Sequence, residues 1–287
     1  MNAELTDRPL RFSILTPVYN GSEFLEELIN SVLQQDYAHY EHIIIDDGSN
    51  DNGSTVNILR RYPHLKWKSQ NNLGQYPTQN KLLKMASGDV ISIICADDLY
   101  PASTVFSSVA RRFAAQPTLD AVIGRTIRLA ERDRRWYVFD PDLPAFLAKR
   151  LIRYSVGIQH CAMFVRRRVV EEKNLYFDPY YKLCGDWDWI IRVLAASTEV
   201  AYTNEVLAYW RLHERHSPRE SQWHDNEARR VCAVYQTSYD LHRVVKGCVN
   251  ILGMMCAKYE QVKQLGLVST MRVVIQNVRR RSFGSAD

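Results

Sequence analysis

Strand-like and helix-like segments alternate through the first half of this 287-residue sequence, and no other feature restricts its fold as strongly. Apolar, β-branched runs predict buried strands, and apolar residues at helical spacing predict the helices between them. The strands are expected at 11–19, 42–45, 65–68, 90–95 and 120–124, and the helices at 24–33, 78–86 and 101–115. Strands and helices that alternate in this way form a mostly parallel sheet flanked by helices. The sequence therefore predicts an α/β fold.

Polar clusters follow three of these strands at the point where each strand ends. They are Tyr19-Asn20, Asp46-Asp47 and Asp97-Asp98. Because ligands bind outside the carboxyl ends of the strands in such sheets, we expect the three clusters to converge on one crevice. Asn20 and Glu23 also have the spacing of a capping pair for the first helix.

The Asp97-Asp98 pair is the strongest of these signals. Two adjacent carboxylates after an apolar strand are costly to bury without a partner. Their oxygens suit Mg²⁺ or Mn²⁺, which completes its coordination with phosphate oxygens and water. A second role is compatible with the first, since Asp98 could cap a helix that begins near Pro101. We favour binding of a metal and a phosphorylated ligand.

The bulk properties of the chain narrow the class of protein. Its net charge is +5 and 46% of its residues are hydrophobic, which suits a folded domain that binds anionic ligands. The first ten residues are polar, and no apolar run reaches the roughly 18 residues that span a bilayer. The six cysteines form no Cys-x-x-Cys pair, so reduced thiols are expected. These features predict a cytoplasmic protein, with peripheral contact to the inner face of the membrane left open. No basic cluster indicates nucleic-acid binding.

Five motifs in order between residues 12 and 101 resemble glycosyltransferase family 2. They are Thr16-Pro17-Val18-Tyr19-Asn20, Asp46-Asp47-Gly48-Ser49 with Asp51, Asn72-Leu73-Gly74 with Asn80, Gly88-Asp89, and Ala96-Asp97-Asp98. Further on, Asp186-Trp187-Asp188-Trp189 with Arg192 is similar to the family's acidic motif, and 209–213 resembles its Arg-x-His element. The resemblance implies a GT-A fold, with a catalytic domain at 1–220 and a helical C-terminal extension at 221–287. Within that domain, 10–124 would bind the nucleotide-sugar and 125–220 the acceptor.

The resemblance also implies roles for single residues. Asp186 would be the catalytic base, and Asp97 and Asp98 would hold Mn²⁺ or Mg²⁺. The residues implied to bind the donor are Pro17, Tyr19, Asp47, Gly74, Asn80, Asp97 and His213.

Three positions depart from the family pattern. Cys95 stands where many members carry Asp, Gly185 stands in place of a Glu, and Gln79 in place of an Arg.

The implied reaction is an inverting transfer of a sugar from a nucleotide-diphosphate sugar to a hydroxyl acceptor. A UDP-sugar is favoured as the donor, with GDP and dTDP sugars open, and the acceptor is a glycan, a lipid-linked saccharide or a small molecule. One alternative is a nucleotidyltransferase, which would be expected to carry a Gly-rich basic loop after the first strand; 17–21 contains no basic residue. The other is a non-catalytic nucleotide-sugar-binding protein, against which the presence of Asp186 argues.

The C-terminal extension and one histidine have several interpretations. Helices are expected over 222–282, and arginines surround the apolar face of the last one. Packing on the catalytic domain, docking on a membrane surface and formation of a homo-oligomer all fit this pattern, with packing slightly favoured. His160 lies in an apolar segment and is interpreted as a core histidine.

Overall fold

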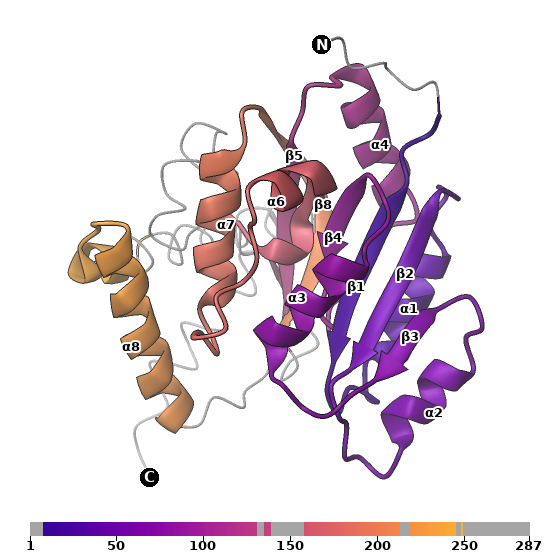
Figure 1. Ribbon diagram of the computed structural model, residues 1–287, viewed down its shortest axis with the longest axis horizontal. Coiled ribbons are helices and arrows are strands. Elements are labelled where there is room, and N and C mark those ends of the chain that lie inside the picture. Colours follow the sequence, from indigo (N-terminus) through magenta and orange to yellow (C-terminus); the bar gives the residue numbers. More distant parts are fainter. Residues whose placement is uncertain (1–7, 131–134, 139–157, 213–217, 245–247, 249–287) are drawn as a thin grey trace, which may run out of the picture.

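The computed structural model describes residues 8–130, 135–138, 158–212, 218–244 and 248. Its centre is an eight-stranded sheet in the order β3-β2-β1-β4-β7-β5-β6, with β8 also paired to β5. The strands are β1 Phe12–Val18, β2 Tyr40–Asp46, β3 Lys66–Ser69, β4 Val90–Ile93, β5 Ala121–Ala130, β6 Arg135–Val138, β7 Met163–Arg166 and β8 Val200–Leu212. The helices are α1 Leu25–Leu33, α2 Ser54–Arg60, α3 Gln75–Met85, α4 Val105–Ala115, α6 Arg167–Glu172, α7 Gly185–Ala196 and α8 Pro218–Val234. The predicted α/β fold, with a sheet flanked by helices, is confirmed (Figure 1).

The strands β3, β2, β1 and β4 run parallel to one another. Beyond them, β7 pairs antiparallel with both β4 and β5, and β8 runs parallel to β5. The chain moves outward from β1 through β2 to β3, and then returns to place β4 on the other side of β1. This reversal is a topological switch point, where the ends of neighbouring strands leave room for a ligand.

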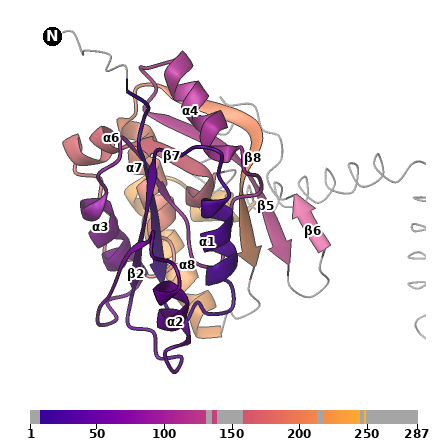
Figure 2. The same cartoon turned by 90° about the vertical axis from the view of Figure 1, so that its right-hand side faces the viewer.

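The parallel part of the sheet is buried on both faces. Phe12 and Ile14 of β1 pack in a core cluster with residues of α1 and α4, whereas Leu15 packs on the opposite face with residues of α3 and α7. Figure 2 shows α1 and α3 on opposite sides of β2. Burial on both faces explains why these strands are almost continuously apolar in sequence.

Several element boundaries differ from the predicted ones. Helix α1 begins at Leu25, and Asn20 is not its cap: its backbone is left-handed, with φ of 50°, and its side chain bonds to the loop after β2. Helix α4 begins at Val105 rather than near Pro101. Its N-cap is Thr104, so the predicted capping role of Asp98 is wrong. The sequence patterns predict neither α2 nor the long strand β8.

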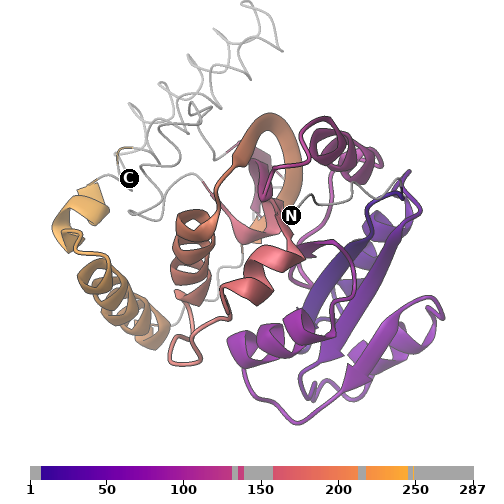
Figure 3. The same ribbon diagram turned by 45° about the horizontal axis from the view of Figure 1, so that its top comes forward.

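Helix α8 packs against α7, at the start of the predicted C-terminal extension. Ala228, Val231 and Cys232 of α8 are buried in the same core cluster as Trp187 and Trp189 of α7. Figure 3 shows the two helices side by side. The arginine-flanked segment at 271–281 lies outside the described residues. Within the part of the chain that is described, none of the helices combines the length and apolar character that crossing a membrane requires.

Candidate functional site

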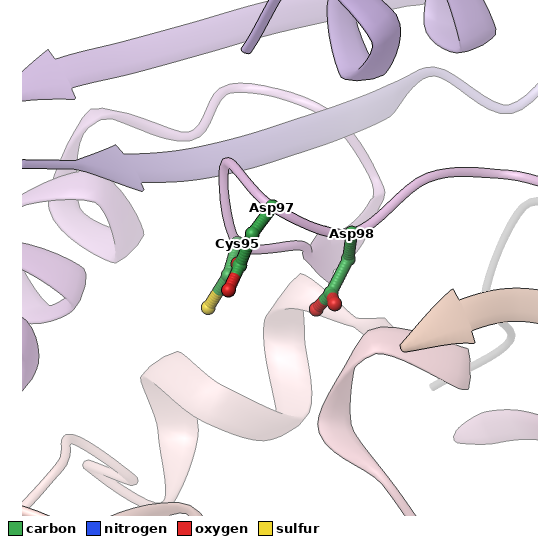
Figure 4. A group of neighbouring side chains, drawn as sticks. All are labelled: Cys95, Asp97 and Asp98. Atoms are coloured by element: carbon green, nitrogen blue, oxygen red, sulfur yellow. The ribbon is translucent and has the colours of Figure 1, made fainter. Parts of the chain in front are cut away.

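A tight turn follows β4 and carries the Asp97-Asp98 pair. Cys95, Asp97 and Asp98 each offer one ligand atom, and these atoms lie within 4.8 Å of one another. Figure 4 shows the three side chains directed toward the same side of the turn. The N–H of Asp98 donates to the carbonyl of Cys95 at 3.1 Å and closes the turn. The pair therefore lies just beyond the carboxyl end of β4.

Asp98 is the most buried member of this group, with 2% of its surface exposed. Its Oδ1 accepts a hydrogen bond of 3.1 Å from the backbone N–H of Arg211, near the end of β8. Backbone bonds of 2.8 and 3.2 Å between Leu99 and Tyr209 hold β8 in this position. Burial, and then the neighbouring Asp97, raise the pKa of Asp98 well above its ordinary value. A nearby cation would relieve the repulsion between two carboxylates crowded in this way.

The group fits a hard divalent cation such as Mn²⁺ or Mg²⁺. Such ions prefer carboxylate oxygens, which Asp97 and Asp98 supply. The third member is less suited, because burial and the two carboxylates raise the pKa of the Cys95 thiol well above its ordinary value. A neutral thiol is a poor ligand for these ions. Asp97 and Asp98 are therefore the residues that would hold the metal.

The loops after β1 and β2 form one connected edge beside this turn. The N–H of Asn20 donates to Ser49 Oγ at 2.8 Å, and Asn20 and Asn50 exchange two further bonds of 2.8 Å. The N–H of Asp47 donates to the carbonyl of Val18, also at 2.8 Å. These bonds fix the ends of both strands at the switch point of the sheet.

Asp47 fixes the loop that leads into α3. Its carboxylate accepts hydrogen bonds from the side chain of Gln70 at 2.6 Å, the N–H of Leu73 at 3.0 Å and the N–H of Gly74 at 2.9 Å. Gly74 has a φ of 89°, a conformation that favours glycine. The side chain of Asp47 therefore holds the backbone of Gly74 in place.

Asp186 lies in the first turn of α7. Its Oδ1 accepts a hydrogen bond of 2.8 Å from the N–H of Trp187 and lies 3.5 Å from the hydroxyl of Tyr76. Its Oδ2 lies 3.6 Å from Nδ1 of His160. Burial raises the pKa of Asp186, but His160 and the Trp187 N–H outweigh this effect, so the net pKa lies below the ordinary value. Asp186 is therefore ionised at neutral pH.

His160 connects this carboxylate to the turn after β4. It begins the short 3₁₀ helix His160–Ala162 in front of β7, and it is buried as predicted. Its Nε2 lies 3.6 Å from Cys95 Sγ, while its Nδ1 faces Asp186. The sequence did not predict that His160 lies between Cys95 and Asp186, because no local pattern shows which distant segments meet in the fold.

The packing of Tyr76 explains why glycine occupies position 185. A Cβ atom at Gly185 would lie 2.7 to 2.8 Å from the Tyr76 ring, closer than side chains pack. Tyr76 is 1% exposed and stacks on Phe177 with ring centroids 5.4 Å apart. The ring therefore has little freedom to move, and the Glu of the family pattern does not fit at this position.

The other predicted site residues fall into different surroundings. Pro17 pairs with Ile45 inside the sheet, whereas Tyr19 is exposed beside the switch point. The Asn80 side chain donates to the carbonyl of Phe177 at 2.8 Å and accepts from its N–H at 2.7 Å, so both of its polar groups are engaged. Gln79 is fully buried in α3. His213 lies outside the described residues.

Arg211, in the predicted Arg-x-His element, contacts Asp98 through its backbone. Its N–H bonds to Asp98, but its guanidinium turns away to Glu27 at 2.7 Å and stacks 3.9 Å above the Phe24 ring. The element therefore reaches the acidic turn and also ties β8 to α1.

The comparisons with known sequences agree with this geometry. The profile of Glycosyl transferase family 2 matches residues 13–175. An uncharacterized glycosyltransferase of Rickettsia felis is 24% identical over 250 residues, which cover 84% of this chain and 40% of that protein. The uncharacterized glycosyltransferase EpsJ of Bacillus subtilis is 28% identical over 211 residues, which cover 69% of this chain and 60% of that protein. The chain thus spans 40% to 60% of the length of these curated relatives.

Two solved structures share the fold. Residues 1–349 of S. aureus TarS in complex with UDP superpose with a TM-score of 0.62 at 20% identity, covering 78% of this chain and 65% of that TarS fragment. The mannosyltransferase PcManGT from Pyrobaculum calidifontis, in complex with GDP-Man and Mn²⁺, has a TM-score of 0.59 at 15% identity, covering 96% of this chain and 82% of PcManGT. The family profile covers more than half of the sequence. This protein belongs to glycosyltransferase family 2.

Proposed function

We propose that this protein is a metal-dependent, inverting glycosyltransferase that moves a sugar from a nucleoside-diphosphate sugar to a hydroxyl group of an acceptor. The observation that carries the proposal is the position of His160. Its two ring nitrogens lie 3.6 Å from Cys95 Sγ and 3.6 Å from Asp186 Oδ2. The turn that would hold the metal and the carboxylate that would accept the proton therefore border the same imidazole.

Asp186 is the proposed general base. Its lowered pKa keeps the carboxylate ionised at neutral pH, so it can accept the proton of the acceptor hydroxyl. The acceptor oxygen attacks the anomeric carbon while the bond to the diphosphate breaks on the opposite face, and an α-linked donor gives a β-linked product. Asp97 and Asp98 would hold a divalent ion, which would neutralise negative charge on the leaving diphosphate.

The loops at the switch point are the proposed donor site. Pro17 and Tyr19 would line the nucleobase pocket, and His213 would lie near the diphosphate. Asp47 and Asn80 would act indirectly, since their side chains bind the backbones of Gly74 and Phe177. A UDP-sugar is the favoured donor, with GDP and dTDP sugars as the alternatives. The solved complexes of TarS with UDP and of PcManGT with GDP-Man and Mn²⁺ support this class of donor.

The acceptor is proposed to bind on the side of the sheet formed after residue 124. In this division, 10–124 binds the donor and 125–220 binds the acceptor, which we propose is a surface glycan or a lipid-linked saccharide. Asp186 lies in the second part, where it could reach an acceptor hydroxyl, and the Asp97-Asp98 turn lies in the first.

The test is cleavage of nucleotide-sugars with water as the acceptor. The protein is incubated with Mn²⁺ and a panel of UDP, GDP and dTDP sugars, and released nucleoside diphosphate is measured. Asp186→Asn should lower the rate by about a hundredfold or more, the usual range for loss of a general base, and leave donor binding unchanged. Asp240→Asn is the matched control, because Asp240 is exposed near the C-terminal end of the described chain.

Proton NMR of the released sugar tests the stereochemistry in the same reaction. An α-linked donor should give the β anomer first. The first appearance of the α anomer would exclude inversion, and release of pyrophosphate in place of nucleoside diphosphate would indicate a nucleotidyltransferase. Donor binding without cleavage, even when acceptor glycans are supplied, would indicate a non-catalytic binding protein.

A further inference from the structure

We infer that Glu227, on helix α8, is a positioning residue for Asp186, and that α8 is a working part of the active site. The inference rests on the proposed role of Asp186 as the base. Glu227 is charged and yet only 7% exposed, and its helix follows the catalytic motifs in the sequence.

Glu227 binds the loop that leads into α7. Its Oε1 accepts the N–H of Lys182, and its Oε2 accepts the N–H groups of Leu183 and Cys184, each at 2.9 Å. Cys184 is the N-cap of α7, and its side chain makes no capping bond. In a capping box, a carboxylate from the first turn of a helix accepts the backbone N–H of the N-cap residue. Glu227 accepts the same N–H at the start of α7, but it does so from another helix.

A second bond ties the turn that follows α8 to α7, on the other side of Asp186 along the chain. The hydroxyl of Tyr235 donates to Asp188 Oδ1 at 2.7 Å. Asp188 Oδ2 accepts two bonds from Arg192, at 2.9 and 2.6 Å. The two connections thus bracket Asp186 along the chain, one at 182–184 and the other at Asp188.

The opposite side of this segment is closed by an aromatic ring. Gly185 lies so close to Tyr76 that even a Cβ atom would collide with it. Residues 184–186 are therefore held between Tyr76 and α8. If the loop were released from Glu227, the start of α7 would shift, and Asp186 would shift with it. A displacement of about 1 Å in a catalytic group can lower a rate by about a hundredfold.

The experiment replaces Glu227 with Gln in the full-length chain. A Gln side chain presents one oxygen and one NH₂ group to three N–H donors, so at least one of them loses its acceptor. We expect kcat for donor cleavage to fall by about tenfold or more, while the Kd for the nucleoside diphosphate with Mn²⁺ stays within about twofold. Hydrogen exchange should accelerate at the amides of 182–187 and not in the β1, β2 and β4 strands.

Two further variants separate positioning from general loss of structure. Tyr235→Phe keeps the ring and removes only the bond to Asp188, so it should lower kcat by less than Glu227→Gln does. Glu172→Gln makes the same chemical change at an exposed position on α6 and should alter neither kcat nor exchange.

The outcomes are distinguishable from those for the proposed function. Faster exchange at 182–187 with unchanged kcat would overturn the positioning role, and so would unchanged exchange at those amides. A fall in kcat that is matched by weaker nucleotide binding or by exchange throughout the sheet would also overturn it, because the effect would then be global. If the wild-type protein cleaves no nucleotide-sugar, the proposed function fails, and with it the catalytic part of the inference; exchange alone then decides whether Glu227 anchors the loop.

Discussion

His42 makes the stability of this fold depend on pH. It lies in the middle of β2 with 1% of its surface exposed. Its Nε2 lies 3.1 Å from Thr16 Oγ1, while its Nδ1 has no hydrogen-bond partner among the described residues. Burial, together with the charge of His64, lowers the pKa of His42 from 6.5 to about 3. A proton on this ring would therefore create a charge that the core cannot solvate.

The direction and size of the effect follow from the two pKa values. Below about pH 6.5 the unfolded chain binds a proton at His42 that the folded chain does not bind, so the free energy of unfolding falls. The loss approaches about 1.4 kcal/mol for each pH unit well below pH 6.5 and amounts to about 2 kcal/mol between about pH 6.5 and pH 4.5. The loss continues until the pH approaches about 3, the pKa in the folded state. A typical domain has only about 5 to 15 kcal/mol of stability, so this effect is a large share.

Urea unfolding at a series of pH values measures this contribution. The replacement His42→Gln keeps a polar group beside Thr16 but cannot titrate. We expect the unfolding free energy of wild-type minus that of the variant to fall by about 2 kcal/mol as the pH falls from about 6.5 to about 4.5. His39→Gln, at an exposed position, is the matched control and should leave the wild-type slope unchanged. Parallel losses of stability in wild-type and His42→Gln would refute the reasoning.

Three further predictions concern residues that hold the fold and the site. Gly185→Ala should lower the melting temperature by an amount that corresponds to about 1 to 3 kcal/mol, because its Cβ meets the Tyr76 ring; an unchanged melting temperature would show that the ring yields. Glu41→Gln should lower the free energy of unfolding by about 2 kcal/mol near neutral pH, because Lys66, Ser13 and Ser87 hold the pKa of this carboxyl at about 2. The loss is limited because solvent screens the half-exposed Lys66. That cost, measured by urea unfolding, should shrink as the pH falls from about 4.5 toward 2 and should not grow. Asn80→Ala should speed hydrogen exchange at the Phe177 amide, and unchanged exchange there would contradict the role of its side chain.

The parallel strands and the acidic turn could be predicted because their signals are local. Apolar runs such as 42–45 and 90–95 are readable without knowing their neighbours, and a parallel sheet brings their carboxyl ends to one edge. The long strand β8 has no such signal, since its 13 residues mix polar and apolar side chains and its pairing with β5 is distant in sequence. Helix α2 is short, with only three buried residues, and gives too little periodicity to detect.

The contacts around Asp186 could not be predicted for a different reason. His160 and Tyr76 reach this carboxylate from other parts of the fold, and each looks like an ordinary core residue in the sequence. The sequence shows that Gly185 replaces the Glu of the family pattern but does not show why. The position of the Tyr76 ring explains the replacement. Tertiary packing, rather than any local pattern, assembles this half of the site.

In the proposed function, the Asp97-Asp98 turn binds a nucleoside diphosphate through a divalent metal. Isothermal titration of UDP, GDP and dTDP in Mn²⁺ and in EDTA tests it directly, with wild-type protein and Asp98→Asn. We predict that at least one of the three binds wild-type protein in Mn²⁺, and that its affinity falls by about tenfold or more both in EDTA and in Asp98→Asn, since a metal-mediated contact is lost in each case. Binding of equal strength in EDTA and in Asp98→Asn would contradict the claim, as would the absence of binding by all three nucleotides in Mn²⁺.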